Sequence, residues 1–251
     1  LLGKTFYQEA GLGIRLDDVG SIGLYRTQQR DFLSSVQDGA VQERNAFAWL
    51  HGMWSLTNRL QLGGTLRADY LHFAYDNHLE SGSARSRADK AILNPKLTLD
   101  YFASDRLQFF VKAGSGFHSN DTRVVLGADA HKILPRALGS DIGAMFKPSN
   151  SLLVQVAVWG LAMEQEFVYV GDAGIVEPSG RSRRVGVDLS ARWQLLKWLS
   201  GDLDLNVAHA RGIDDAGEAT YIPLAPWITS TGGLTAELPN GLRGSLRYRF
   251  L

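Results

Sequence analysis

The stretch SRRVGVDLSARWQLLKWLSGDLDLNVAHAR, residues 182–211, decides the fold class of this chain. It contains two runs in which apolar and polar side chains alternate at every second position. In 185–193 the odd-numbered residues Val, Val, Leu, Ala and Trp share one face of an extended strand. In 202–207 Leu, Leu and Val stand opposite Asp, Asp and Asn. The strand segments that carry these runs are each about ten residues long or longer, the length of a tilted strand that crosses a bilayer and roughly twice that of an ordinary strand.

The composition of the 251-residue chain limits the possible classes of protein. Its 26 basic and 26 acidic side chains give zero net charge, which argues against a nucleic-acid partner bound through a basic face. The absence of cysteine excludes disulfides and thiolate metal sites. No apolar run is long enough for a membrane helix, but strands of a membrane barrel need apolar residues only at alternate positions. Nothing at the N-terminus resembles a signal peptide, so we expect a mature or internal fragment.

The same alternation recurs along the chain and divides it into hairpins. Short turns are predicted near positions 18, 58, 105, 149, 197 and 240, at intervals of about 40 to 50 residues. Long polar connections are predicted at 34–44, 76–90, 118–136, 171–180 and 212–220, and the strand beginning at Leu152 is expected to reach Val170. Alternating short turns and long loops are typical of outer-membrane barrels, so the sequence predicts an all-β, transmembrane antiparallel barrel section of about twelve strands. A soluble propeller or sandwich is the alternative, although a propeller blade would spend each period on four short strands.

Aromatic residues are placed where a membrane barrel needs them. Trp54, Tyr101, Phe146 and Trp193 each precede a short turn by a few residues. Rings at the level of the lipid headgroups form the girdles of such barrels, whereas a sandwich core would spread them along the strands.

The face opposite the apolar one carries both signs of charge. If the apolar face meets lipid, these side chains point inward: Arg15, Arg67, Asp69, Lys96, Asp100, Lys112, Asp141, Asp188, Arg192, Asp202, Asp204, Arg243, Arg247 and Arg249. A small dry barrel could not hold them without extensive pairing, so a wide barrel with a water-filled or polar-plugged lumen is predicted.

Several segments resemble TonB-dependent outer-membrane receptors. NPKLTLDYFASDRLQFFVKAGSGFHSND, residues 94–121, is similar to the family's Pro-Lys-Leu strand and the following strand that ends in a Gly-Phe-His/Arg-Ser-x-Asp run. The stretch 180–211 resembles its Ser-Arg-x-x-Gly-Val-Glu/Asp strand and the hairpin after it. Residues 167–184 and 221–250 are similar to neighbouring parts of the same barrels, so the resemblance covers roughly residues 45–250.

The resemblance implies a 22-stranded barrel closed by a plug domain, in the outer membrane of a Gram-negative bacterium. Such a receptor imports a scarce extracellular nutrient, such as a ferric siderophore, cobalamin or a sugar, with energy from the TonB complex, and it contacts lipid and lipopolysaccharide. The sequence departs from the family because no plug domain or TonB box is visible. We therefore expect residues 1–251 to be a section of the barrel domain, with about ten strands, the plug and the TonB contact belonging to the parent protein.

Few residues of the sequence suggest a binding or catalytic site. Arg181, Arg183, Arg184 and His118 are candidates for ligand binding at the outer mouth. The arginines could attract an anionic ligand, but a solvated strand start, or contacts with lipopolysaccharide phosphates, is the favoured interpretation.

An outer-membrane enzyme is the competing class. A lipase would need a serine and a histidine, and His118-Ser119 with Asp121 nearby offers them. Adjacent residues of a strand point in opposite directions, so no enzyme is expected. The six histidines lack metal-ligand spacing, and no metal or cofactor is predicted. A complete twelve-stranded pore or lipase, or a soluble propeller-like binding protein, remains the alternative function.

Overall fold

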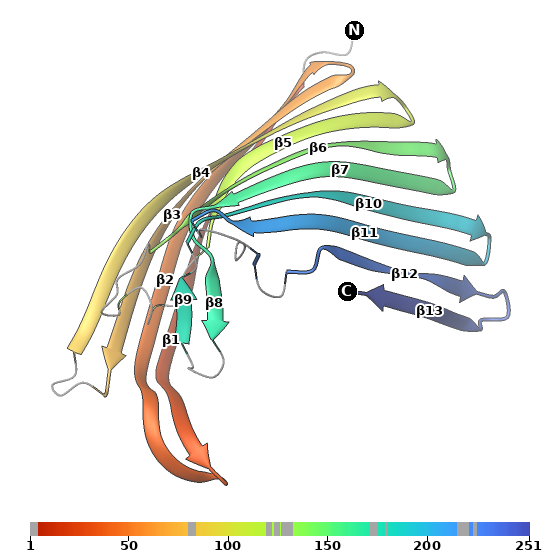
Figure 1. Cartoon of the computed structure of the whole chain (residues 1–251). Coiled ribbons are helices and arrows are strands. Elements are labelled where there is room, and N and C mark those ends of the chain that lie inside the picture. The colour runs from red at the N-terminus through yellow and green to blue at the C-terminus, as the bar shows by residue number, and fades with distance from the viewer. Residues whose placement is uncertain are drawn as a thin grey trace.

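The chain forms one curved antiparallel sheet of eleven strands, seen in a computed structural model that describes residues 5–79, 84–118, 122, 126, 133–170, 175–178, 180–214, 221–222 and 225–251 (Figure 1). Neighbours in the sheet follow chain order, from β1 to β7 and then β10 to β13. The strands are β1 (Phe6–Gln28), β2 (Asp31–Thr57), β3 (Leu60–Asn77), β4 (Ala84–Ser104), β5 (Leu107–Phe117), β6 (Arg136–Ser149), β7 (Leu152–Met163), β10 (Ser182–Leu196), β11 (Leu199–Gly212), β12 (Ile228–Glu237) and β13 (Arg243–Phe250). A separate hairpin, β8 (Phe167–Val170) and β9 (Ile175–Pro178), lies in the connection between β7 and β10. Among the described residues no helix is long and apolar enough to cross a membrane.

The pairing register places the predicted apolar and charged residues on opposite faces of the sheet. Leu205 pairs with Leu189, which pairs with Val156 on the next strand, so one apolar row crosses β11, β10 and β7. Large apolar side chains on this face are exposed, with Leu12 and Ile14 of β1 at 89% and 75%. A sheet face that exposes such residues in rows needs an apolar surrounding. The predicted all-β membrane-barrel wall is confirmed, with eleven strands where about twelve were expected.

The aromatic girdle lies on this apolar face at one end of the sheet. Phe146 pairs with Val154 and Trp193 pairs with Leu152, both next to the β6–β7 turn. Tyr101 pairs with Leu60 beside the β2–β3 turn. All four rings of the predicted girdle are exposed. Their common level and face fit a ring of amphipathic side chains at a lipid–water boundary.

Short turns gather at this same end, which we call the turn end; the opposite end is the loop end (Figure 1). In four of these turns a carbonyl accepts a hydrogen bond from the second strand after the turn. The Arg59 carbonyl accepts from Phe102 N at 2.8 Å, and the Arg106 carbonyl from Lys147 N at 2.8 Å. In the same way, the Ser151 carbonyl accepts from Gln194 N at 2.7 Å, and the Trp198 carbonyl accepts from Glu237 N at 2.7 Å. The period predicted from the sequence is therefore the spacing of one hairpin to the next.

The first predicted hairpin is wrong. Asp17 and Asp18 lie inside β1, and residues 34–44 lie inside β2 instead of a polar loop. The chain reverses at Gln29 and Arg30, two non-glycine residues with positive φ of 48° and 78°. Two positive φ angles make the turn whose twist matches a β-hairpin, for which Asn-Gly would be the usual sequence. The Asp-Asp-Val-Gly sequence thus predicted a turn that the real hairpin does not use.

Other boundaries also differ from the prediction. The strand that begins at Leu152 stops at Met163, and 167–170 pairs with 175–178 in the loop-end hairpin. Much of the predicted 76–90 connection belongs to β3 and β4, which pair as far as Asn77 and Ala84. A propeller is ruled out for the described residues because all strands except β8 and β9 form one continuous sheet.

The sheet is open, with β1 and β13 at its two edges. Neither edge strand has a second partner among the described residues. Unpaired backbone groups are not tolerated in hydrocarbon, so a wall of this kind needs further strands at both edges.

A small apolar core lies on the charged face near the loop end. Leu71, Phe73 and Ile92 of β3 and β4 are almost fully buried there with Leu134. Phe117, Leu126 and Ile133 pack against them, so part of the β5–β6 connection folds back onto this face of the sheet.

Candidate functional site

The charged face is the candidate functional site, and we call it the inner wall. All fourteen charged residues predicted to point inward lie on it, because antiparallel pairing links them through one register. Lys112 of β5, for example, is directly opposite Asp141 of β6. Opposite charges placed across a strand pair attract one another and hold the register.

A network of polar contacts crosses the inner wall from β7 to β13. Asp188 accepts hydrogen bonds from the Trp159 indole N–H, at 3.0 Å, and from the Asn206 amide. Arg192 places Nη2 at 2.9 Å from both carboxylate oxygens of Asp204. Arg247 bridges to Asp202, which joins β13 to β11.

A second, more buried cluster lies on β2 and β3. The Asp69 carboxylate, with 0% of its side chain exposed, accepts from Arg67 Nε at 2.8 Å and Nη2 at 2.7 Å. Asn45 Nδ2 donates to the same carboxylate at 3.2 Å. The Arg67 guanidinium lies 3.9 Å above the ring of Phe47, so it is held by an ion pair and a cation–π contact together.

The structure separates the three arginines that the sequence grouped at the outer mouth. Arg184 faces inward and donates to both oxygens of the Glu166 carboxylate at 2.6 and 2.8 Å. Ser182 Oγ donates to the same carboxylate at 2.6 Å, and Glu166 is buried. This cluster holds the start of the β7–β10 connection against β10, and it pairs Arg184 with a carboxylate.

Arg181 is also paired with a carboxylate, whereas Arg183 has no ion-pair partner among the residues that the structure describes. The Arg181 guanidinium donates two hydrogen bonds, at 2.9 and 2.7 Å, to Asp214 Oδ1. These hydrogen bonds and the attraction to the carboxylate raise the pKa of Arg181 above its ordinary value. Arg183 points to the apolar, outward face and is exposed. The three therefore do not form one anion site at the mouth.

His118 lies at the end of β5, where its backbone N–H donates to the Pro135 carbonyl at 3.2 Å, and it is exposed. Its proposed catalytic companions Ser119 and Asp121 lie outside the described residues. Within the described part of the chain, no three His, Cys, Asp or Glu side chains are grouped closely enough to hold a metal ion. Two of the other histidines are hydrogen-bonded to carboxylates: His72 Nδ1 to Asp89 at 2.8 Å and His78 Nδ1 to Asp38 at 3.2 Å.

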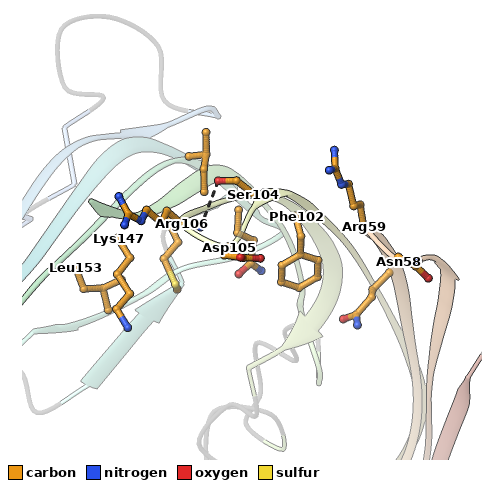
Figure 2. Close-up of a pocket in the computed structure, with 12 residues that line it drawn as sticks. Asn58, Arg59, Phe102, Ser104, Asp105, Arg106, Lys147 and Leu153 are labelled. Atoms are coloured by element: carbon orange, nitrogen blue, oxygen red, sulfur yellow. Dashed lines mark hydrogen bonds between the residues drawn. The ribbon is translucent and has the colours of Figure 1, made fainter. Parts of the chain in front are cut away.

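A cavity of about 560 Å³ opens at the turn end of the inner wall. Phe102 and Leu153 supply apolar parts of its lining, and Arg59, Arg106 and Lys147 supply three cations (Figure 2). Asp105 is the acidic residue that lines it, so the lining is net positive. The Arg106 backbone N–H donates to Ser104 Oγ at 3.2 Å and fixes the β4–β5 turn at its rim.

Sequence reasoning found fourteen charged members of the inner wall but not Arg184 or the neutral and loop partners of these charges. Asn45, Trp159 and Glu166 are all missed. Asn45 and Trp159 sit at inward positions of strands whose register the sequence could not provide. Glu166 follows shortly after β7, and its backbone N–H donates to the Gly180 carbonyl at 2.9 Å, so the pairing of β7 with β10 brings its carboxylate to Arg184.

Together these features define the class of protein: an open section of a wide membrane β-barrel with a charged, ion-paired lumen. The family model described as TonB dependent receptor-like, beta-barrel, matches residues 5–250. The chain therefore belongs to the TonB-dependent receptor β-barrel family.

Solved structures agree with this fold. The ferric yersiniabactin uptake receptor FyuA from Yersinia pestis superposes with a TM-score of 0.75 at 16% identity, over 98% of this chain and 39% of that one. The copper transporter OprC gives 0.71 at 14% identity, over 97% and 41%. The ferric citrate transporter FecA in the unliganded form gives 0.70 at 14% identity, over 94% and 38%. No curated protein matches by sequence. The chain thus spans well under half the length of the structures it resembles.

Proposed function

We propose that this chain is a section of the barrel wall of an outer-membrane receptor that binds a scarce nutrient outside the cell and imports it with energy from the TonB complex. The family match over residues 5–250 carries the proposal. In this placement the turn end faces the periplasm and the loop end faces the exterior, as is usual for bacterial outer-membrane barrels. The apolar face contacts lipid. Neither catalysis nor a resident cofactor is part of the proposed function.

The charges of the inner wall support the proposal that a polar domain fills the lumen. Its ion pairs already satisfy many of its charges, such as Arg192 with Asp204, while Lys96 and Arg249 offer charge to a partner. The cavity at the turn end is lined by both apolar and cationic side chains, which fits an acidic and partly apolar segment of a plug. The plug itself belongs, in this proposal, to the rest of the parent protein.

A ferric siderophore is the proposed cargo. Support comes from the similar structures named above, two of which are described as taking up ferric complexes. OprC is described as a copper transporter, so copper is the competing cargo.

Uptake assays test the proposal directly. The gene that encodes this chain is deleted, and uptake of iron-55 siderophores, radiolabelled copper and labelled cobalamin is measured in cells with and without a functional TonB complex. We expect loss of uptake of one ferric siderophore, restored by the intact gene only when TonB is active. Unchanged uptake of every ferric siderophore, together with loss of copper or cobalamin uptake, would overturn the assignment of cargo.

A further inference from the structure

Part of the β5–β6 connection lies against the inner wall of β3 and β4. We call this part the inner segment, and it consists of Leu126, Ile133, Leu134 and Pro135. Leu134 is only 5% exposed, and Leu71 and Phe73, with which it shares one apolar cluster, are 1% and 0% exposed. The inner segment therefore takes part in covering the apolar side chains of this part of the wall almost completely.

The wall under the inner segment differs in composition from the rest of the inner wall. Leu71 and Phe73 follow Asp69 on the inward face of β3. Ile92 of β4 is the cross-strand partner of Asp69 and faces inward as well. Nearer the turn end, the inward positions of β3 carry charge, as at Arg67. Three large apolar side chains would meet water in the lumen if the inner segment moved away, and this cost opposes such a movement.

Hydrogen bonds hold the end of the inner segment on both sides. His118 N donates to the Pro135 carbonyl at 3.2 Å, which extends the pairing of β5 with β6 by one step. Arg136 Nη1 donates to the Leu93 carbonyl of β4 at 3.2 Å. Arg136 N donates to Glu164 Oε2, just after β7, at 3.0 Å. A connection that swung away from the wall as a unit would have to break these bonds.

The Arg136 side chain takes the place of a strand partner. β4 pairs with β5 only as far as Lys96 and Gly114, so the Leu93 carbonyl lies beyond the last pair of these two strands. The guanidinium supplies the donor that this carbonyl lacks in the described part of the sheet. The root of the inner segment is thus built into the wall.

We infer that the inner segment is a fixed narrowing of the loop-end mouth, which keeps its contacts with β3 and β4 while cargo enters. The inference rests on the proposed function, because it concerns a barrel through which cargo passes. Cargo would then move beside the inner segment, over accessible polar side chains such as Arg192 and Asp204, which are 50% and 45% exposed. A connection that opened as a lid would instead uncover Leu71, Phe73 and Ile92 in every transport cycle.

Single cysteines can report on this contact because the native chain has none. Ile92→Cys places a thiol under the inner segment. The matched control is Lys90→Cys, at the neighbouring inward position of the same strand, where the native side chain is exposed. Cells that carry the full-length receptor are treated with a membrane-impermeant maleimide, at rest and during uptake of a mixture of iron-55 siderophores. The labelling rates of the two thiols are compared.

We expect Ile92→Cys to react at least about tenfold more slowly than Lys90→Cys in both states, because a buried thiol reacts only during local opening. Adding Leu134→Ala should remove most of this protection, whereas Leu134→Met, which conserves volume, should keep it. Labelling of Ile92→Cys that accelerates to the control rate during uptake would overturn the inference. Equal rates at rest would overturn it as well, and so would protection that Leu134→Ala leaves unchanged.

The same cells separate this inference from the proposed function. If the wild type takes up no iron-55, the assignment of cargo fails, whereas the labelling of Ile92→Cys still decides whether the inner segment covers the wall. If uptake is normal and Ile92→Cys becomes reactive during it, only the fixed position of the inner segment is lost.

Discussion

Asp69 and Asp204 both face the lumen, but their surroundings differ. The Asp69 side chain is fully buried and accepts from Arg67 and Asn45. The Asp204 side chain is 45% exposed and pairs with Arg192, which is 50% exposed. Water screens the second pair and not the first carboxylate, so the same chemical change should have unequal effects on stability.

We therefore expect Asp69→Asn to lower the free energy of unfolding by about 1–3 kcal/mol, because it removes the negative charge that Arg67 and Asn45 bond. Asp204→Asn should lower it by less than about 1 kcal/mol. Urea unfolding in detergent micelles, followed by tryptophan fluorescence, measures both. Equal losses for the two variants would contradict the difference in burial.

Gly241 occupies the β12–β13 turn with φ of +86°, and a Cβ added there would meet no heavy atom within 4 Å. Its substitution is therefore a test of backbone conformation alone. Gly241→Ala should cost about 1 kcal/mol, since the left-handed region disfavours residues with a Cβ. Gly244→Ala is the control, because its added Cβ also meets open space but its φ is ordinary. A control loss as large as that of Gly241→Ala would refute the conformational explanation.

At the scale of elements, the β1–β2 hairpin is the most distinctive part of the wall. β2 has 27 residues, about 90 Å at roughly 3.3 Å per residue, whereas a tilted strand crosses a bilayer with about 9–11. β3 pairs with β2 only as far as Gly39, and residues 31–38 of β2 extend beyond that register while they are paired with β1. The hairpin tip at Gln29 and Arg30 should therefore stand well outside the membrane.

Cysteine labelling tests this placement cleanly because the native chain has no cysteine. Gln29→Cys should react with a membrane-impermeant maleimide on intact cells. Asn150→Cys, in the β6–β7 turn, should react only after the outer membrane is permeabilised. The reverse order of labelling would mean that the sheet is inverted or does not span the membrane.

The sequence predicted the elements whose alternation and turn chemistry agree, and it failed where they conflict. The hairpins around residues 105, 149, 197 and 240 are confirmed because their turns are short and their strands alternate strictly. The first hairpin was misplaced because Asp17-Asp18-Val19-Gly20 has turn-forming residues, while the true turn uses Gln29 and Arg30 at unfavourable positive φ. At the candidate site, the inward charges followed from alternation. Pairings such as Arg184 with Glu166 depend on the register between β7 and β10, which no local pattern encodes.

At the scale of the whole molecule, the open edges of the sheet are the main unsatisfied feature. One edge of β1 and one edge of β13 have no described strand with which their backbone N–H and C=O groups could pair. In a closed barrel these groups would pair with further strands.

Amide hydrogen exchange should reveal this difference. If the chain is produced alone in detergent, we expect rapid exchange of the outward-edge amides of β1 and β13 and slow exchange in central strands such as β6 and β7. In the native protein taken from outer membranes, both edges should be protected as well as the centre. Protected edges in a monomer of the isolated chain would show that the sheet closes without further strands.

The assignment of faces underlies every part of this account, from the lipid side of the β10–β11 hairpin to the charged lumen. The most direct measurement places a nitroxide, through single cysteine variants, at each position from 202 to 207 of β11 in the membrane-embedded protein. Collision with dissolved oxygen, which concentrates in hydrocarbon, should be high at Leu203, Leu205 and Val207 and low at Asp202, Asp204 and Asn206. Oxygen access without this two-residue period, or with its phase reversed, would contradict the claim that this sheet is a barrel wall with lipid on its apolar face.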